Sequence, residues 1–177
     1  NYPVGAPEGA IAKVDTAASR TEPERWILTR LASTVDEVHK QLADYRFEAN
    51  FGTPGMPVLV TDEPAPLGGN AGPSPDHLLG AAVANCLASS LLFALRKFKN
   101  QPEPIRAVAV VEKARNAERR MRIGVDLHLG APSAGMQMLE RALAQFEDFC
   151  VVTQSVRAGI AVDVRVFDAD GTPLTPA

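Results

Sequence analysis

The chain has 177 residues and a formal net charge of -3 at pH 7. Its length suits one domain with a sizeable core, and 46% hydrophobic with 22% charged residues is ordinary for a globular protein. The weakly acidic balance gives no electrostatic reason to bind nucleic acid or an anionic membrane, so neither partner is predicted. Two cysteines are too few for a disulfide-stapled secreted scaffold, and we expect a reducing, cytoplasmic compartment.

Residues 1 to 20 are rich in Ala, Gly and Pro without a clear period, which indicates an extended arm, and no signal-peptide pattern is present. From Thr21 a capping-box pattern and apolar residues at three- and four-residue intervals favour a helix as far as Leu42, although several β-branched residues there also suit strands. We assign residues 1–44 to an N-terminal extension without a predicted function.

A single domain is expected over residues 45–177, and it begins with a hairpin. Apolar and polar residues alternate from Tyr45 to Gly52, and a second run from Met56 to Thr61 follows a Thr-Pro-Gly turn. Residues 62–75 are rich in Pro and Gly and form a linker to the next element.

A long apolar helix is predicted from Ser74 to about Lys99. Ser74 suits the N-cap and Pro75 the first turn, and the run Leu78–Leu95 has no ionisable group other than the thiol of Cys86. The run is at the lower limit for a membrane span, but its Ala and Ser content and the strands downstream favour a buried helix of a soluble domain.

Two further strands, a helix and a final strand complete the pattern. Alternating residues predict strands over 105–113 and 121–129, a 3.6-residue period predicts a helix over about 133–148, and a last alternating run covers 160–167. This order of elements indicates the α+β class.

Cys86 and Cys150 are either a redox pair or two inert core residues. From the residues alone a core role for Cys86 is favoured, because free cysteine is among the most buried residue types. Burial raises a thiol pKa, so activation of Cys86 would need a nearby cation, and its neighbours on the helix supply none.

Two motifs around these cysteines resemble a known family. The segment Ser74-Pro-Asp-His-Leu-Leu-Gly-Ala-Ala-Val-Ala-Asn-Cys86 resembles the P-E-E-L-L-x-A-A-x-A-A-C helix of the OsmC/Ohr proteins. The segment Cys150-Val-Val-Thr-Gln-Ser-Val resembles the family's second motif, C-P-V-S-x-x-L, which also leads into a final strand. The order of elements from about Tyr45 to Asp168 agrees as well.

The resemblance implies an OsmC-like α+β fold, in which antiparallel sheets wrap a long buried central helix and two chains form an intertwined homodimer. It also implies thiol-dependent reduction of organic hydroperoxides. Cys86 would attack the peroxide and Cys150 would resolve the resulting sulfenic acid as a disulfide. The implied partners are a small-molecule hydroperoxide and a dithiol reductant.

The family's supporting groups are a glutamate before the first cysteine and an arginine that stabilises the thiolate. The glutamate position falls on Asp76, which is one methylene shorter and is also an ordinary first-turn acid. No motif identifies the arginine. Arg46 on the first clear strand is our candidate, while Arg25, Arg30 and Arg157 remain open, and without such an arginine the activity should be weak or absent.

Two alternatives stay open: a dimer of this fold that lacks peroxidase activity and binds an apolar small molecule around Cys86, and a structural or regulatory dimer with core cysteines. The three histidines show no ligand spacing, and no phosphate-loop pattern occurs among the glycines of residues 64–75. No metal, nucleotide or other cofactor is predicted.

Overall fold

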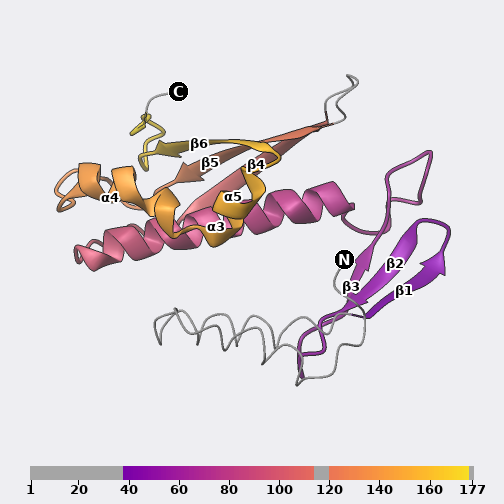
Figure 1. The fold of residues 1–177 in the computed structure, drawn as a ribbon. Coiled ribbons are helices and arrows are strands. Elements are labelled where there is room, and N and C mark those ends of the chain that lie inside the picture. The colour runs from indigo at the N-terminus through magenta and orange to yellow at the C-terminus, as the bar shows by residue number, and fades with distance from the viewer. Residues whose placement is uncertain (1–37, 114–119, 176–177) are drawn as a thin grey trace, which may run out of the picture. The chain divides into compact units, whose positions relative to one another are not determined.

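The structure, a computed structural model, describes residues 38–113 and 120–175 (Figure 1). It divides into two compact units, the first ending at Ser74 and the second beginning at Pro75. The predicted N-terminal arm, nearly all of the helix expected from Thr21 and the polar segment 114–119 lie outside the described residues.

The first unit contains a three-stranded antiparallel sheet in the order β1-β2-β3, formed by β1 (Val38–Ala43), β2 (Arg46–Asn50) and β3 (Leu59–Thr61). The predicted hairpin is confirmed by the pairing of β2 with β3. Residues 38–43 are a strand and not the end of a helix, because they pair with β2. The boundary predicted at residue 45 therefore falls in the turn between β1 and β2.

The loop after β3 is organised by one carboxylate. Asp62 accepts hydrogen bonds from the backbone N–H of Glu63 at 2.9 Å and from those of Gly69 and Ala71 at 3.0 Å each. Arg46 of β2 contacts the same carboxylate at 3.4 Å. Since Asp62 is buried and satisfies several backbone donors at once, it fixes the path of the glycine-rich loop. No sequence pattern predicts this role for Asp62.

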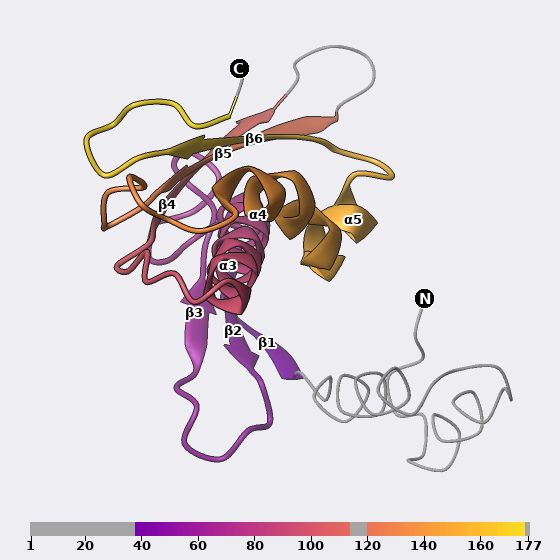
Figure 2. The same cartoon turned by 90° about the vertical axis from the view of Figure 1, so that its left-hand side faces the viewer.

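The second unit packs three α-helices on one side of a three-stranded sheet (Figure 2). In chain order the elements are α3 (Pro75–Lys97), β4 (Arg106–Lys113), β5 (Met121–His128), α4 (Leu139–Gln145), the short 3-10 helix η1 (Phe146–Phe149), α5 (Val151–Val156) and β6 (Ala161–Phe167). The α+β class predicted from the order of elements is confirmed.

The sheet of the second unit has the order β4-β5-β6 and is mixed. β4 and β5 pair antiparallel, as expected from their alternating sequences. β6 departs from the antiparallel expectation, because it runs parallel to β5 over its whole length. Parallel neighbours need a crossover connection, and α4, η1 and α5 supply it. This crossover packs on α3 and carries Cys150 with it.

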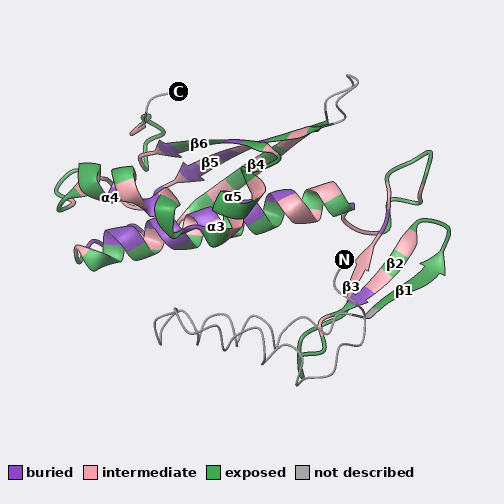
Figure 3. Cartoon of the chain, in the orientation of Figure 1, coloured by how far each residue is buried: buried purple, intermediate pink, exposed green. Residues whose placement is uncertain are grey.

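The core of the second unit lies between α3, the inner face of the sheet and the crossover (Figure 3). The largest fully buried side chains come from all three: Leu87, Leu91 and Leu95 from α3, Ile123, Leu127 and Val166 from the sheet, and Phe146 from the crossover. A Cβ atom on Gly80 would lie 2.6 Å from Cγ2 of Val111, so the glycine lets α3 lie close against β4.

One side of α3 is exposed between the two ends of the helix. The exposed positions there are Ala81, Ala82, Asn85, Ser89 and Phe93. With a mean hydropathy of 2.0, α3 is the one helix among the described residues that is long and apolar enough to cross a membrane, a property that core helices of soluble proteins share.

The helix predicted over residues 133–148 begins later than expected. Gly135 and Met138 adopt left-handed conformations, with φ of 89° and 51°, and α4 starts only at Leu139. The turn before it is tied to the end of β6, because the Ser133 backbone N–H donates to Asp168 at 2.8 Å. The separate short helix α5 was not predicted.

Candidate thiol site

Cys86 lies near the middle of α3 on the side that faces the crossover. Its helical position follows from the uninterrupted apolar run, since the only turn-forming residues of this segment precede Pro75. Its side chain is half-buried and packs against the core cluster. The sulfur is therefore within reach of solvent.

Cys150 lies at the junction of η1 and α5 and is fully buried. Its backbone N–H closes η1 on the carbonyl of Glu147 at 3.0 Å, and its side chain caps α5. The sulfur accepts the backbone N–H of Thr153 at 3.4 Å and lies 2.9 Å from the Thr153 hydroxyl. Local helix-end geometry thus fixes the direction of this thiol.

The structure brings Cys86 and Cys150 together as two free thiols, close enough for Cys150 to affect the ionisation of Cys86. We call them the thiol pair. Burial is the main cause that raises the pKa of the Cys86 thiol, and the neighbouring Cys150 thiol raises it further. A raised pKa leaves Cys86 mostly protonated at neutral pH, and only the thiolate is a good nucleophile.

Two neutral donors oppose that effect. The backbone N–H of Val152 and the hydroxyl of Ser90 both hydrogen-bond to the Cys86 sulfur and lower its pKa. Ser90 is buried one helical turn beyond Cys86, where a residue four positions on lies on the same face. Sequence reasoning missed Ser90 because a serine in an apolar helix carries no charge, although its i+4 spacing was a usable signal.

An aromatic pair joins the two segments that carry the thiols. The rings of Phe93 on α3 and Phe149 on η1 meet edge to face, with centroids 5.3 Å apart. Both rings are exposed, and Val151 next to Cys150 is exposed by 66%. Phe93 lies about two helical turns beyond Cys86 on α3, and Phe149 directly precedes Cys150, so this exposed apolar surface borders the segments that carry both thiols.

Asp76 is not brought to the thiol pair within the chain. It lies in the first turn of α3, and its carboxylate pairs with the ammonium of Lys113 on β4 at 3.0 Å. About ten residues of regular helix separate Asp76 from Cys86, a rise of about 15 Å. The ion pair with Lys113 anchors the start of α3 to the sheet.

Both described arginines that the sequence proposed form ion pairs with carboxylates. Arg46 belongs to the first unit, where it pairs with Asp62. Arg157 at the end of α5 pairs with Glu147 and donates to the carbonyl of Val162 at 3.2 Å. Arg25 and Arg30 lie outside the described residues.

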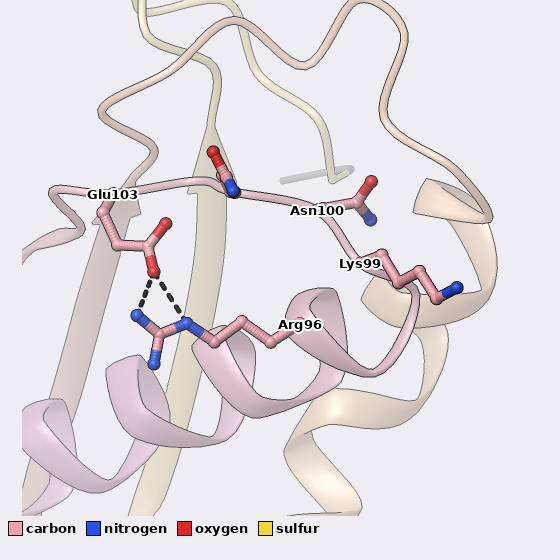
Figure 4. A pocket seen from close by; sticks show the side chains of 5 residues that line it. Arg96, Lys99, Asn100 and Glu103 are labelled. Carbon is pink, nitrogen blue, oxygen red and sulfur yellow. Dashed lines mark hydrogen bonds and ion pairs between the residues drawn. The ribbon is translucent and has the colours of Figure 1, made fainter.

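Two surface depressions in the second unit are not lined by either cysteine. One, of about 640 Å³, lies at the C-terminal end of α3, where Arg96 Nε donates to Glu103 at 2.7 Å (Figure 4). The other, a groove of about 470 Å³, runs between α3 and β4. Small side chains such as Ala81, Ala88 and Ala109 line this groove. No group of three potential metal ligands occurs in residues 38–113 and 120–175.

The sequence matches the model of the family "OsmC-like protein" over residues 68–165, more than half of the chain. No curated protein matches the chain.

Several solved structures share the fold at low sequence identity. A protein from Psychrobacter arcticus 273-4 described as an osmotic stress induced and detoxification response protein superposes with a TM-score of 0.60 and 18% identity over 73% of this chain and 93% of its own. The organic hydroperoxide resistance protein OsmC of Legionella pneumophila superposes with a TM-score of 0.56 and 19% identity over 73% of this chain and 95% of its own. An organic hydroperoxide resistance protein of Elizabethkingia anophelis superposes with a TM-score of 0.58 and 16% identity over 73% of this chain and 94% of its own.

A long apolar helix beneath a small sheet, with one thiol on the helix and a second on the crossover that packs against it, defines a class of α+β proteins with paired cysteines. The chain belongs to the OsmC-like protein family. The resemblance indicated by the two cysteine motifs is thereby confirmed.

Proposed function

We propose that the protein reduces organic hydroperoxides through Cys86 and Cys150, in defence against oxidative stress. The observation that best supports this proposal is the contact between two free thiols of unequal exposure. Cys86 is half-buried and can meet a small molecule, whereas Cys150 is fully buried and shielded from one. That division suits one attacking and one resolving thiol.

The chemistry proceeds in three balanced steps. The Cys86 thiolate attacks one peroxide oxygen, the O–O bond breaks, and the other oxygen leaves as an alcohol after taking a proton, which leaves a sulfenic acid on Cys86. Cys150 then attacks the sulfenic sulfur, so that an S–S bond forms and water leaves. A dithiol reductant returns both thiols by exchange, and we place the protein in the cytoplasm, where such reductants are maintained.

The preference for an organic peroxide follows from the surface beside Cys86. The exposed rings of Phe93 and Phe149 and the exposed Val151 offer apolar contact to an alkyl or aryl group. Hydrogen peroxide has no such group and gains nothing from this surface. Organic hydroperoxides are therefore the expected substrates.

Activation of Cys86 rests on the groups that hold its thiolate. The Ser90 hydroxyl and the Val152 N–H contribute in the structure, but burial still raises the pKa. We keep Arg46 as the candidate cation and Asp76 as the candidate acid of the motif. An Arg46→Ala variant with an unchanged rate of peroxide consumption would remove Arg46 from the proposal.

The test is stopped-flow consumption of cumene hydroperoxide and of hydrogen peroxide by the reduced protein. Wild type should consume the organic peroxide faster, Cys86→Ser should consume neither, and Cys150→Ser should complete one turnover and stop at the sulfenic acid. Equal rates for wild type and Cys86→Ser would refute the peroxidase function.

The raised pKa of Cys86 favours a second candidate, a dimer of this fold that binds an apolar small molecule without reducing peroxides. In that case a fluorescent apolar probe should bind next to the aromatic pair, and Phe93→Ser should weaken its binding while wild type leaves cumene hydroperoxide intact. Rapid peroxide consumption by wild type excludes this candidate.

We also propose that the protein is a homodimer. The uncovered side of α3 is a row of small and apolar residues, and the groove between α3 and β4 continues it. A helix with a mean hydropathy of 2.0 is normally enclosed on more sides than one chain provides here.

Analytical ultracentrifugation tests the dimer with two matched variants. Ala81→Arg places a charge at the groove and should release monomers, whereas Ala144→Arg on the exposed side of α4 should leave the dimer intact. A wild-type monomer at micromolar concentration contradicts the dimer.

A further inference from the structure

The strongest unassigned feature of the second unit is the engagement of Thr153 with Cys150. The side chain of Thr153 is completely buried. Its hydroxyl lies 2.9 Å from the Cys150 sulfur, and its backbone N–H donates to the same sulfur at 3.4 Å. One residue thus holds the second thiol by both of its polar groups.

This double contact sets the side-chain rotamer of Cys150. The backbone contact alone would cap α5, as a small polar side chain does at a helix start. The hydroxyl contact adds a second restraint on the sulfur, from a residue within the same helical turn. A disulfide requires a narrow range of Cβ positions and torsions, so the direction of this sulfur decides how readily it can meet Cys86.

We propose that Thr153 is the positioning residue for disulfide closure, acting through Cys150 in the second step of the reaction. This inference rests on the proposed function for its biological setting, though the closure step itself can be driven by other oxidants. In closure, the Cys150 sulfur bonds to the Cys86 sulfur, the S–O bond of the sulfenic acid breaks, and the hydroxide leaves as water with the Cys150 proton. The Thr153 hydroxyl keeps the attacking sulfur aligned during that displacement.

The reaction with peroxide should not depend on Thr153. The groups that hydrogen-bond to the Cys86 sulfur are Cys150, the backbone N–H of Val152 and the hydroxyl of Ser90. Thr153 is not one of these groups, and its hydroxyl and backbone N–H contact the Cys150 sulfur instead. A change at Thr153 should therefore slow disulfide closure without changing the rate of the reaction with peroxide. Loss of a merely structural residue would not separate the two rates.

The experiment uses the full-length protein and two oxidants. Cumene hydroperoxide gives the sulfenic acid on Cys86, and oxidised glutathione gives a mixed disulfide on Cys86 with release of one glutathione. Cys150 closes the same disulfide in both cases, with water or a second glutathione as the leaving group. Rapid acid quenching and mass spectrometry measure the first adduct and the closed disulfide separately.

Thr153→Val keeps the shape of the side chain and the backbone N–H but removes the hydroxyl. It should leave the first adduct forming at the wild-type rate and slow closure about tenfold with both oxidants, as expected for one lost hydrogen bond to a reacting group. Thr153→Ser should restore closure. Ser155→Ala removes another hydroxyl from α5, one that bonds to the carbonyl of Val151, and should leave closure unchanged.

Each outcome decides the inference. Wild-type closure in Thr153→Val, or equal slowing of closure in Thr153→Val and Thr153→Ser, overturns it. If the valine variant does not fold, the comparison of Thr153→Ala with Thr153→Ser gives the same decision. A wild-type protein that ignores cumene hydroperoxide but closes with oxidised glutathione, and does so more slowly as Thr153→Val, refutes the peroxidase function while it supports the role of Thr153.

Discussion

The carboxylate of Asp76 lies 3.0 Å from the ammonium of Lys113, so the acid that the family motif places near the reactive thiol is engaged with the neighbouring strand. Lys113 is exposed by 57% at its side chain, whereas Asp76 is exposed by only 15%. The pair therefore joins the first turn of α3 to the end of β4, and solvent screens it on the lysine side.

Asp76→Asn tests whether this contact is structural. The substitution removes a first-turn charge and an ion pair and should lower the free energy of unfolding by roughly 0.5 to 1 kcal/mol, and it should slow peroxide consumption only if Asp76 also serves as the acid of the motif. Thermal unfolding and stopped-flow kinetics on one preparation give both values. A large loss of rate with unchanged stability would instead assign Asp76 to the thiolate.

The reactivity of Cys86 should keep rising with pH to values at which an ordinary thiol is already fully ionised. Burial and then Cys150 raise the pKa of Cys86, so the folded protein holds this proton more tightly than a free thiol does, and half-maximal reactivity should lie at a higher pH than that of a free thiol. Alkylation by iodoacetamide across pH 7 to 11, followed by mass spectrometry of the Cys86 peptide, measures it. A midpoint below that of a model thiol would contradict the burial effect.

Replacement of Cys150 by alanine should move that midpoint to lower pH. The Cys150 thiol raises the pKa of Cys86 through its hydrogen bond and through charge repulsion when ionised, and alanine removes both. The same alkylation profile measures the change. An unchanged profile in Cys150→Ala would mean that the two sulfurs do not influence each other in solution.

Ser90→Ala should have the opposite effect on Cys86. Its hydroxyl donates to the sulfur and favours the thiolate, so its loss should raise the midpoint further and slow peroxide consumption at pH 7 by several-fold, on the order of what one hydrogen bond provides. Ser89→Ala is the matched control, because Ser89 is the adjacent serine of the same helix and is exposed. Equal effects of the two substitutions would remove the specific role of Ser90.

The loop after β3 should open in acid at a pH set by Asp62. Backbone hydrogen bonds, with that of Ala71 the largest, hold the pKa of Asp62 below its usual range against the opposing effect of burial. Because the folded pKa lies below the unfolded one, this stabilisation is present above the ordinary aspartate pKa and is lost as the pH falls through the folded value.

Amide exchange of Gly69 and Ala71 measures this stabilisation by NMR. Protection should persist to below the ordinary aspartate range and then collapse, and Asp62→Asn should weaken it at neutral pH. Glu63→Gln is the control, since its side chain holds neither amide. Wild-type protection in Asp62→Asn would show that other contacts order the loop.

Much of this fold follows from the sequence because its signals are long and regular. The apolar run Leu78–Leu95 is preceded by Pro75 and followed by Arg96 and Lys97, and it predicts α3 closely. Alternation predicts β4, β5 and β6. The predicted start of α4 was wrong because Met138 takes a left-handed conformation that its residue type does not predict.

The parallel pairing of β6 and the contacts of the thiol pair were harder to predict. Strand alternation defines which face is buried and not the direction of the neighbouring strand, although the long connection after Leu129 permits a crossover. The motifs located Cys86 and Cys150, but their hydrogen bonds arise from tertiary packing. Thr153 had a local signal, since a small polar residue three positions after a helix cap often meets that cap.

The crossover that makes β6 parallel also sets an order of assembly. The β4–β5 hairpin joins segments that are close along the chain, whereas β6 must close a much longer loop before it can pair with β5, and long loops close more slowly. Cys150 is carried on that loop, between two strands that must both be in place to hold it against α3. A growing or truncated chain that ends before residue 161 contains both sulfurs but lacks the strand that pairs with β5 after the crossover, so we expect Cys150 to settle against α3 only once the last strand is in place.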